Sequence, residues 1–297
     1  MKKWFAILVS LLMVLSVPAL AEVDGEDVGI TMFSSAFGQM LTEGEAVQLD
    51  LDGDGAKESV TWKSVPLDEY DDEVVVEVVP ASGEAIAWHS GMLYSAWACV
   101  DDLDGDGVME LLVTGDLMSD DYATFCLHLA DGALTLLPVA NTFRGADPEA
   151  EPYCDAGYGM ITAIGPNKLE LTGSQDVLGT YFGSRTFTLK DGRLELNDDG
   201  LWHFETGDAD SWEYRALTPK AEIAATFVDG DQQTEGALKV GERIQITASD
   251  RTSVAWFVTE DGREGFLSIA PDEENGWGTL VNGVSEEELF EFVPYAD

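Results

Sequence analysis

The residues with the clearest chemistry lie in two short acidic stretches that share one pattern. Loop 1 (residues 50–58) reads Asp-Leu-Asp-Gly-Asp-Gly-Ala-Lys-Glu, and loop 2 (residues 102–110) reads Asp-Leu-Asp-Gly-Asp-Gly-Val-Met-Glu. Calcium loops present their oxygen ligands in this order and add a backbone carbonyl at position 7. The candidate calcium ligands, two of them through backbone carbonyls, are Asp50, Asp52, Asp54, Ala56 and Glu58 in loop 1 and Asp102, Asp104, Asp106, Val108 and Glu110 in loop 2.

The spacing of these carboxylates has electrostatic consequences. Three aspartates within five positions repel one another unless a cation lies between them, and glycine at position 6 permits the sharp turn. We expect two weak calcium sites of the extracellular class, filled permanently and serving structure rather than signalling. The alternative for each loop is a solvated acidic turn that binds no metal.

The residues after each loop indicate the kind of calcium site. An EF-hand has a bidentate glutamate at position 12 and helices on both sides, but position 12 is Thr61 in loop 1 and Val113 in loop 2. The stretches 59–62 and 111–114 are apolar or β-branched, which predicts strands. An acidic loop followed by a strand, twice, resembles the FG-GAP/VCBS repeats of β-propeller blades. That resemblance implies a mainly β fold with calcium at the blade loops.

The repetition extends beyond the loops over residues 46–205. Strands are expected near 58–64, 73–79 and 84–88, and in the second copy near 96–100, 109–115, 122–129 and 133–138. A third copy over 160–171 and 187–196 has Gly165-Pro166-Asn167 in place of the acidic loop. Three units are too few for an ordinary closed propeller. We therefore expect a partial or irregular propeller whose ends are covered by other segments.

The remaining boundaries follow from composition and pattern. Residues 1–21 have a basic start, an apolar run and the cleavage site Ala19-Leu20-Ala21, which predicts a secretory signal peptide and an extracellular protein. No membrane span is expected. Residues 22–45 form a lead-in with a short amphipathic helix expected over 30–41, and residues 206–218 form a connector.

Residues 219–297 show alternating strand patterns over 240–246, 254–258 and 261–267, with a hairpin turn at Glu260-Asp261-Gly262. This pattern resembles a bacterial SH3-like domain, which implies a small β-barrel that contacts glycan or peptide. Ser285-Glu286-Glu287-Glu288 predicts a capping box that opens a short C-terminal helix.

The formal net charge of −42 makes nucleic acid and anionic membranes unfavourable partners and attracts cations. The cysteines are Cys99, Cys126 and Cys154. This odd number leaves open one disulfide with a spare thiol, in any of three pairings, or free buried thiols throughout.

Catalytic signals are few. The histidines His89, His128 and His203 are scattered, and no metalloprotease, serine-hydrolase or phosphate-loop motif occurs. The sequence favours a secreted, calcium-stabilised, non-catalytic binding or adhesion-type module whose partner is a cell-wall glycan, a peptide or a host-surface ligand. The alternative is an enzyme or enzyme-accessory protein acting on cell-wall or host polysaccharide, which requires two facing carboxylates in a cleft.

Overall fold

The computed structural model describes residues 38–69, 71–81, 83–118, 121–140, 153–154, 156–165, 167–196, 199–206, 209–272 and 278–296. All of them belong to one compact unit, Phe33–Asp297. The signal peptide predicted over 1–21 and most of the lead-in lie outside the described residues. The fold is mainly β, with about 60% strand and 3% helix, and consists of antiparallel sheets that remain open among these residues.

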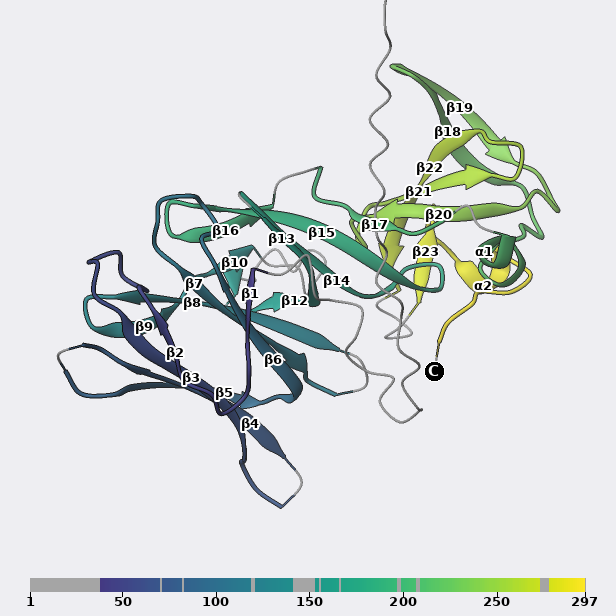
Figure 1. Cartoon of the computed structure of the whole chain (residues 1–297). Coiled ribbons are helices and arrows are strands. Elements are labelled where there is room, and N and C mark those ends of the chain that lie inside the picture. Colours follow the sequence, from purple (N-terminus) through teal and green to yellow (C-terminus); the bar gives the residue numbers. More distant parts are fainter. Residues whose placement is uncertain are drawn as a thin grey trace, which may run out of the picture. The chain divides into compact units, whose positions relative to one another are not determined.

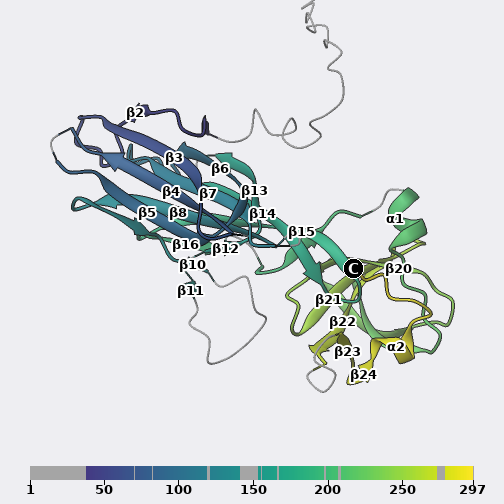
Figure 2. The same ribbon diagram turned by 90° about the horizontal axis from the view of Figure 1, so that it is seen from below.

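Three groups of four consecutive strands repeat one antiparallel meander, in which each strand pairs with the next along the chain. Unit 1 contains β2 (Val47–Leu49), β3 (Glu58–Pro66), β4 (Asp72–Val79) and β5 (Ile86–Met92). Unit 2 contains β6 (Tyr94–Asp101), β7 (Glu110–Asp116), β8 (Tyr122–Ala130) and β9 (Ala133–Leu136). Unit 3 contains β13 (Met160–Gly165), β14 (Lys168–Asp176), β15 (Thr180–Lys190) and β16 (Arg193–Leu196). Strands β3, β4 and β5 lie side by side in Figure 1 and Figure 2.

These units confirm the strands expected in all three copies, including the copy without an acidic loop. Their burial follows from strand geometry, because successive side chains point to opposite faces. In β14, for example, Leu169 and Leu171 are buried while Glu170 between them is more exposed. Strand β7 is buried along nearly its whole length, because it lies inside its sheet between β6 and β8 and is covered on both faces. Loop 2 therefore leads directly into one of the most buried strands.

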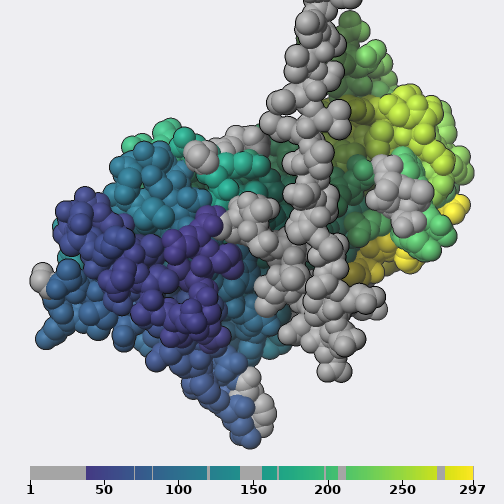
Figure 3. Space-filling model, viewed as in Figure 1, coloured from purple at the N-terminus to yellow at the C-terminus, as the bar shows by residue number. Residues whose placement is uncertain are grey.

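A helix was expected over residues 30–41. This prediction is wrong for Gln39–Leu41, and residues 30–37 lie outside the described part of the chain. Gln39–Leu41 form strand β1, which pairs antiparallel with β6 through Gln39↔Val100 and Leu41↔Ala98. Strand β1 supplies backbone partners to the edge of unit 2, a long-range gain that outweighs the local helical spacing. The space-filling view shows the purple N-terminal part of the described chain, which includes the start of unit 1, against the blue atoms of the residues that follow it (Figure 3).

Consecutive units are joined at equivalent places by a tyrosine and an aspartate. The Tyr94 hydroxyl of unit 2 donates to Asp71 before β4, and the Tyr158 hydroxyl donates to Asp121 before β8, at 3.0 Å. Tyr158 belongs to β12 (Gly157–Tyr158), which lies beside β8. At the far end of unit 3, the Thr180 N–H donates to the Pro294 carbonyl at 3.1 Å. The C-terminal segment therefore contacts unit 3 at the start of β15.

The C-terminal region continues the sheet of unit 3, because β17 (Trp202–Phe204) pairs with both β15 and β20. Its other elements are α1 (Ala209–Tyr214), β18 (Ile223–Asp229), β19 (Gln232–Leu238), β20 (Ile244–Ser249), β21 (Val254–Thr259), β22 (Glu264–Pro271), β23 (Thr279–Val281), β24 (Val284–Ser285) and α2 (Glu286–Leu289). The predicted hairpin is confirmed by the pairing of β21 with β22. The C-terminal helix α2 is present, but Ser285 makes no side-chain capping hydrogen bond, so the predicted capping box is wrong.

Two of the three cysteines lie in the apolar core shared by units 2 and 3. Cys99 and Cys126 are buried free thiols on strands β6 and β8, and burial raises the pKa of both. A buried, uncharged thiol packs as a small apolar group and is a poor nucleophile. The side chain of Cys154, in the short strand β11 (Tyr153–Cys154), lies outside what the structure describes.

Candidate metal centre

Both acidic loops occupy the same place in their units. Loop 1 connects β2 to β3, and loop 2 connects β6 to β7. In each case the last residue of the loop, Glu58 or Glu110, is also the first residue of the following strand. The corresponding corner of unit 3, where Gly165 ends β13 and Asn167 precedes β14, contains no carboxylate. The meander therefore positions two acidic turns and one neutral turn at equivalent corners.

In loop 1, carboxylate oxygens of Asp50, Asp52 and Glu58 lie within 4.8 Å of one another. The backbone folds around them: the Gly55 N–H donates to Asp50 Oδ2 at 3.0 Å, and the Ala56 N–H donates to Asp54 Oδ1 at 2.7 Å. Asp50 Oδ1 is buried and has no hydrogen-bond partner among the described residues. A buried carboxylate oxygen without a donor is unfavourable unless a cation neutralises it.

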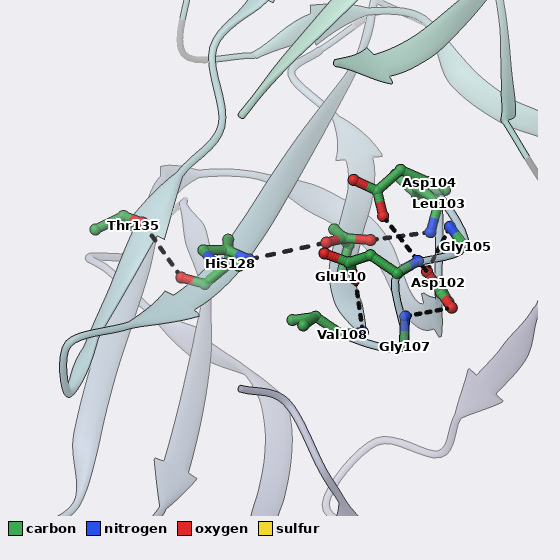
Figure 4. Close-up of polar contacts among 10 residues, drawn as sticks. Asp102, Leu103, Asp104, Gly105, Gly107, Val108, Glu110, His128 and Thr135 are labelled. Carbon is green, nitrogen blue, oxygen red and sulfur yellow. Dashed lines mark hydrogen bonds and ion pairs between the residues drawn. The ribbon is translucent and has the colours of Figure 1, made fainter. Parts of the chain in front are cut away.

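In loop 2, the three carboxylate groups that lie within 4.8 Å of one another are those of Asp102, Asp104 and Asp106. Asp102 is more fully satisfied than its counterpart in loop 1. Its Oδ1 accepts N–H bonds from Gly105 at 2.7 Å and from Asp106 at 3.1 Å, and its Oδ2 accepts one from Gly107 at 2.9 Å. Figure 4 shows the loop wrapped around this side chain. Backbone donors therefore hold the first ligand position in place.

The glutamate at position 9 closes each loop in the same way. Glu58 and Glu110 are 3% and 2% exposed. Their Oε2 atoms accept the N–H groups of Leu51 and Leu103, at 2.8 and 2.9 Å respectively. These leucines, at position 2 of each loop, are themselves 1% exposed. Each loop is therefore fixed by a buried apolar side chain at one end and a buried carboxylate at the other.

The surroundings of Glu110 shift its pKa. Burial raises the pKa of Glu110 to about 7, the hydrogen bond from Leu103 opposes this, and the charges of Asp104, Asp106 and Asp102 raise it further. A divalent cation in the loop reverses this balance, because it favours the ionised form of every nearby carboxyl group. His128 Nδ1 lies 3.8 Å from Glu110 Oε1 (Figure 4).

The predicted ligands are thus brought together in part. Asp50, Asp52 and Glu58 converge in loop 1, and Asp102, Asp104 and Asp106 converge in loop 2. Asp54 and Glu110 are not among these convergent groups, and the N–H groups of Ala56 and Val108 donate to the position 5 aspartates. The clusters consist of hard oxygen donors, which suit Ca²⁺ or Mg²⁺.

Two contacts of loop 2 were not predicted from the sequence. A Cβ on Gly53 of loop 1 would lie 3.1 Å from Val108 Cγ2, so the two loops are in contact. The N–H of Asn167, in the neutral corner of unit 3, donates to the Leu103 carbonyl at 2.9 Å. Loop 2 therefore touches the corresponding corners of both other units, and a pattern search along the chain cannot detect such contacts.

A second recess lies in the C-terminal region, between the tips of the β18–β19 and β21–β22 hairpins. This groove has a volume of about 540 Å³ and is lined by Phe227, Val228, Asp229, Gly230, Thr234, Gly262, Arg263 and Glu264. The Arg263 guanidinium lies 4.8 Å from the centre of the Phe227 ring. The groove thus combines an aromatic surface, a cation and two carboxylates.

Comparison with known proteins identifies no relative. No family model, no curated protein and no solved structure matches this chain. Among the described residues, no helix is both long enough and apolar enough to cross a membrane. The functional assignment therefore depends on the two acidic loops and the groove.

Proposed function

We propose that the protein is a secreted, calcium-stabilised, non-catalytic binding or adhesion-type module of the bacterial cell surface or extracellular space. The observation that carries this proposal is the repetition of one acidic corner in two adjacent units, each with three carboxylate groups within 4.8 Å. A single acidic turn is common on protein surfaces. Two such turns support a cation-binding role, because each is closed by a buried glutamate and each has an N–H bond from position 6 to the position 1 aspartate.

Calcium is the cation that best fits these loops. Its ligands are oxygens in a flexible arrangement, whereas Mg²⁺ demands near-ideal octahedral geometry and retains several waters. The protein's formal net charge of −42 further raises the local cation concentration. In this proposal, Ca²⁺ fixes the corners of units 1 and 2 as FG-GAP/VCBS loops do, and the repeat region acts as a rigid support.

We infer that the groove of the C-terminal region is the ligand surface. Aromatic faces stack on sugar rings and on peptide side chains, and arginine pairs with carboxylates. Phe227 and Arg263 bring both features to one recess, where Arg263 also forms ion pairs with Glu242 and Asp261, so an acidic ligand would take the place of these carboxylates. Cell-wall glycans and their peptide stems carry both kinds of partner group, which agrees with the SH3-like resemblance of residues 219–297.

The direct test of the calcium assignment is thermal unfolding of the mature protein in EGTA, then with added Ca²⁺ or Mg²⁺. We expect Ca²⁺ at about 100 times its dissociation constant to stabilise each site by roughly 2.7 kcal/mol, and Mg²⁺ to do much less. The double variant Asp52→Asn/Asp104→Asn should lose this response. Melting curves that do not change between EGTA and Ca²⁺ would remove the proposal.

Ligand binding needs a separate test, because calcium can bind to the loops even when the groove binds no ligand. A glycan array and peptidoglycan pull-down, with the wild type and with Phe227→Ala, would measure it. Loss of binding in this variant, with unchanged calcium-dependent melting, supports the groove. Binding that persists in Phe227→Ala assigns it to another surface.

An enzyme acting on polysaccharide is the second candidate, because Asp229 and Glu264 line the same groove. Glycoside hydrolysis by a carboxylate pair requires both groups. Release of reducing sugar from cell-wall polysaccharide by the wild type, and its loss in Asp229→Asn and in Glu264→Gln, would replace the binding assignment with a catalytic one. Binding without release in the same assay supports the non-catalytic module.

A further inference from the structure

Away from the acidic loops, the junction between unit 3 and the C-terminal region contains an unusual cluster of buried polar side chains. Gln175 of β14 is 0% exposed, Arg185 of β15 is 8% exposed and Trp202 of β17 is 0% exposed. Arg251, in the turn between β20 and β21, donates a hydrogen bond to Gln175. We call these four residues the arginine cluster.

Packing brings the cluster together. The Arg185 guanidinium lies 4.8 Å from the centre of the Trp202 ring, and Arg251 Nη1 donates to Gln175 Oε1 at 3.1 Å. The paired residues Gly173 and Gly183 leave room for it, since a Cβ on Gly183 would lie 3.2 Å from Trp202 Cβ and closer still to Phe204. The close packing of aromatic rings over this glycine pair shields the cluster from solvent.

In the arginine cluster, hydrogen-bond donors lack partners but acceptors do not. Gln175 Nε2, Arg185 Nε and Trp202 Nε1 are buried and have no acceptor in the described part of the chain. All three atoms are donors. Exchanging the amide oxygen and nitrogen of Gln175 does not help, because it would place an NH₂ group against the Arg251 guanidinium. The Arg185 Nη2 group donates to the Gly200 carbonyl, but the three N–H groups named above have no acceptor, and a buried N–H without one is costly.

Charge is also unbalanced. Neither arginine forms an ion pair with a carboxylate among the described residues. The acidic residues whose charge acts on Arg185 are Asp250 and Asp199. Asp250 accepts N–H bonds from Thr252, Ser253 and Val254, and Asp199 accepts one from Leu201. Burial first, and then the charge of Arg251, lower the pKa of Arg185 to about 10.

We propose that the arginine cluster binds a small inorganic anion of halide size. A halide accepts several N–H bonds and donates none, so it satisfies donors on both sides of the junction and balances two guanidinium charges. A water molecule meets the need less well, because its two hydrogens would point into a site that contains surplus donors. The bound anion would link Gln175 of unit 3 to Arg251 of the C-terminal region.

An anion site in a chain of net charge −42 must be built from local cations, since the overall field repels anions. The cluster meets this condition with two of the chain's 15 basic residues. This site is separate from the acidic loops, and its presence does not depend on the proposed function.

The test is thermal unfolding in saturating calcium gluconate at fixed ionic strength, with sodium gluconate replaced stepwise by chloride, bromide or sulfate. We expect halides to raise Tm by about 2–4 °C in a saturable way. Arg185→Met and Arg251→Met should abolish the rise in Tm. If these variants fail to fold, Trp202→Phe is the alternative: it removes one N–H, retains an aromatic ring and should weaken the rise. Arg243→Met is the matched control, because Arg243 also lies over a tryptophan, at 5.8 Å from the Trp212 ring, outside the cluster.

Crystals grown in bromide give a direct readout. An anomalous bromide peak beside Arg185 and Trp202 supports the proposal. A halide response that survives in both arginine variants, a preference for sulfate, no response in the wild type, or ordered water in place of bromide would each overturn it.

Discussion

Loop 1 and loop 2 differ in sequence only at positions 7 and 8, where Ala56-Lys57 in one corresponds to Val108-Met109 in the other. Their structures nevertheless differ. Position 9 joins the convergent carboxylates in loop 1, whereas position 5 does so in loop 2. Asp102 accepts three backbone N–H bonds, but Asp50 accepts one and retains a buried oxygen without a donor.

This difference arises from the surroundings rather than from the loops. Loop 2 contacts Gly53 and Asn167 from the two flanking corners, and His128 approaches its closing glutamate. Among the described residues, loop 1 contacts one other corner, that of loop 2. A preorganised site binds its ligand with less loss of conformational freedom. We therefore expect loop 2 to bind Ca²⁺ more tightly, and loop 1 to depend more on Ca²⁺ for its order.

The largest effects should come from the closing glutamates. Replacing Glu58 or Glu110 by Ala leaves the N–H of Leu51 or Leu103 buried without an acceptor, which we expect to cost about 2–3 kcal/mol of unfolding free energy even in EGTA. Glu110→Gln keeps an acceptor and removes charge repulsion from the three aspartates of loop 2. Glu110→Gln should therefore lower the free energy of unfolding only in Ca²⁺. Urea unfolding in EGTA and in Ca²⁺ measures this.

An acidic turn without metal-like clustering provides a contrast. The Asp250 carboxylate accepts N–H bonds from Thr252, Ser253 and Val254. Burial opposes ionisation, but these bonds and the Ser253 hydroxyl outweigh it and lower the pKa of Asp250. We expect Asp250→Ala to cost about 1–2 kcal/mol, equally in EGTA and in Ca²⁺.

The pH dependence of that cost has a defined sign. Because the folded-state pKa lies below the unfolded-state value, the stabilisation is fully present above the unfolded pKa and is lost as pH falls through the folded pKa. The difference in the free energy of unfolding between wild type and Asp250→Ala should therefore close below about pH 4. A gap that widens as pH falls would contradict the assigned hydrogen bonds.

The position 1 aspartates should differ by about 1 kcal/mol in EGTA. Asp102→Ala removes three backbone hydrogen bonds and Asp50→Ala removes one, and exposed bonds of this kind contribute modestly. In saturating Ca²⁺ both variants lose a ligand, so the gap should narrow. Equal costs in EGTA would mean that the two loops are equally ordered without metal.

The sequence predicted those parts of the fold that depend on neighbouring residues. The meander strands follow from alternation, and the acidic corners follow from ligand spacing. Strand β1 could not be predicted in this way, because Gln39–Leu41 have no strand signal until β6 offers them backbone partners. The approach of His128 to Glu110 and the gathering of Gln175, Arg185 and Arg251 likewise depend on pairings between strands that are distant in sequence.

The smallest predicted effect isolates the contact between the two loops. Gly53 and Gly105 both occupy position 4, with φ of +71° and +77°, so replacement by Ala strains both backbones by a similar amount, roughly 1 kcal/mol. Only Gly53 faces Val108, whereas a Cβ on Gly105 meets nothing within 4 Å. Gly53→Ala should therefore also weaken calcium binding at loop 2, by about two- to threefold, and Val108→Ala should restore it. Calorimetric titration of the single and double variants measures this coupling, and identical loop 2 affinities in Gly53→Ala and the wild type would show that the corners bind independently.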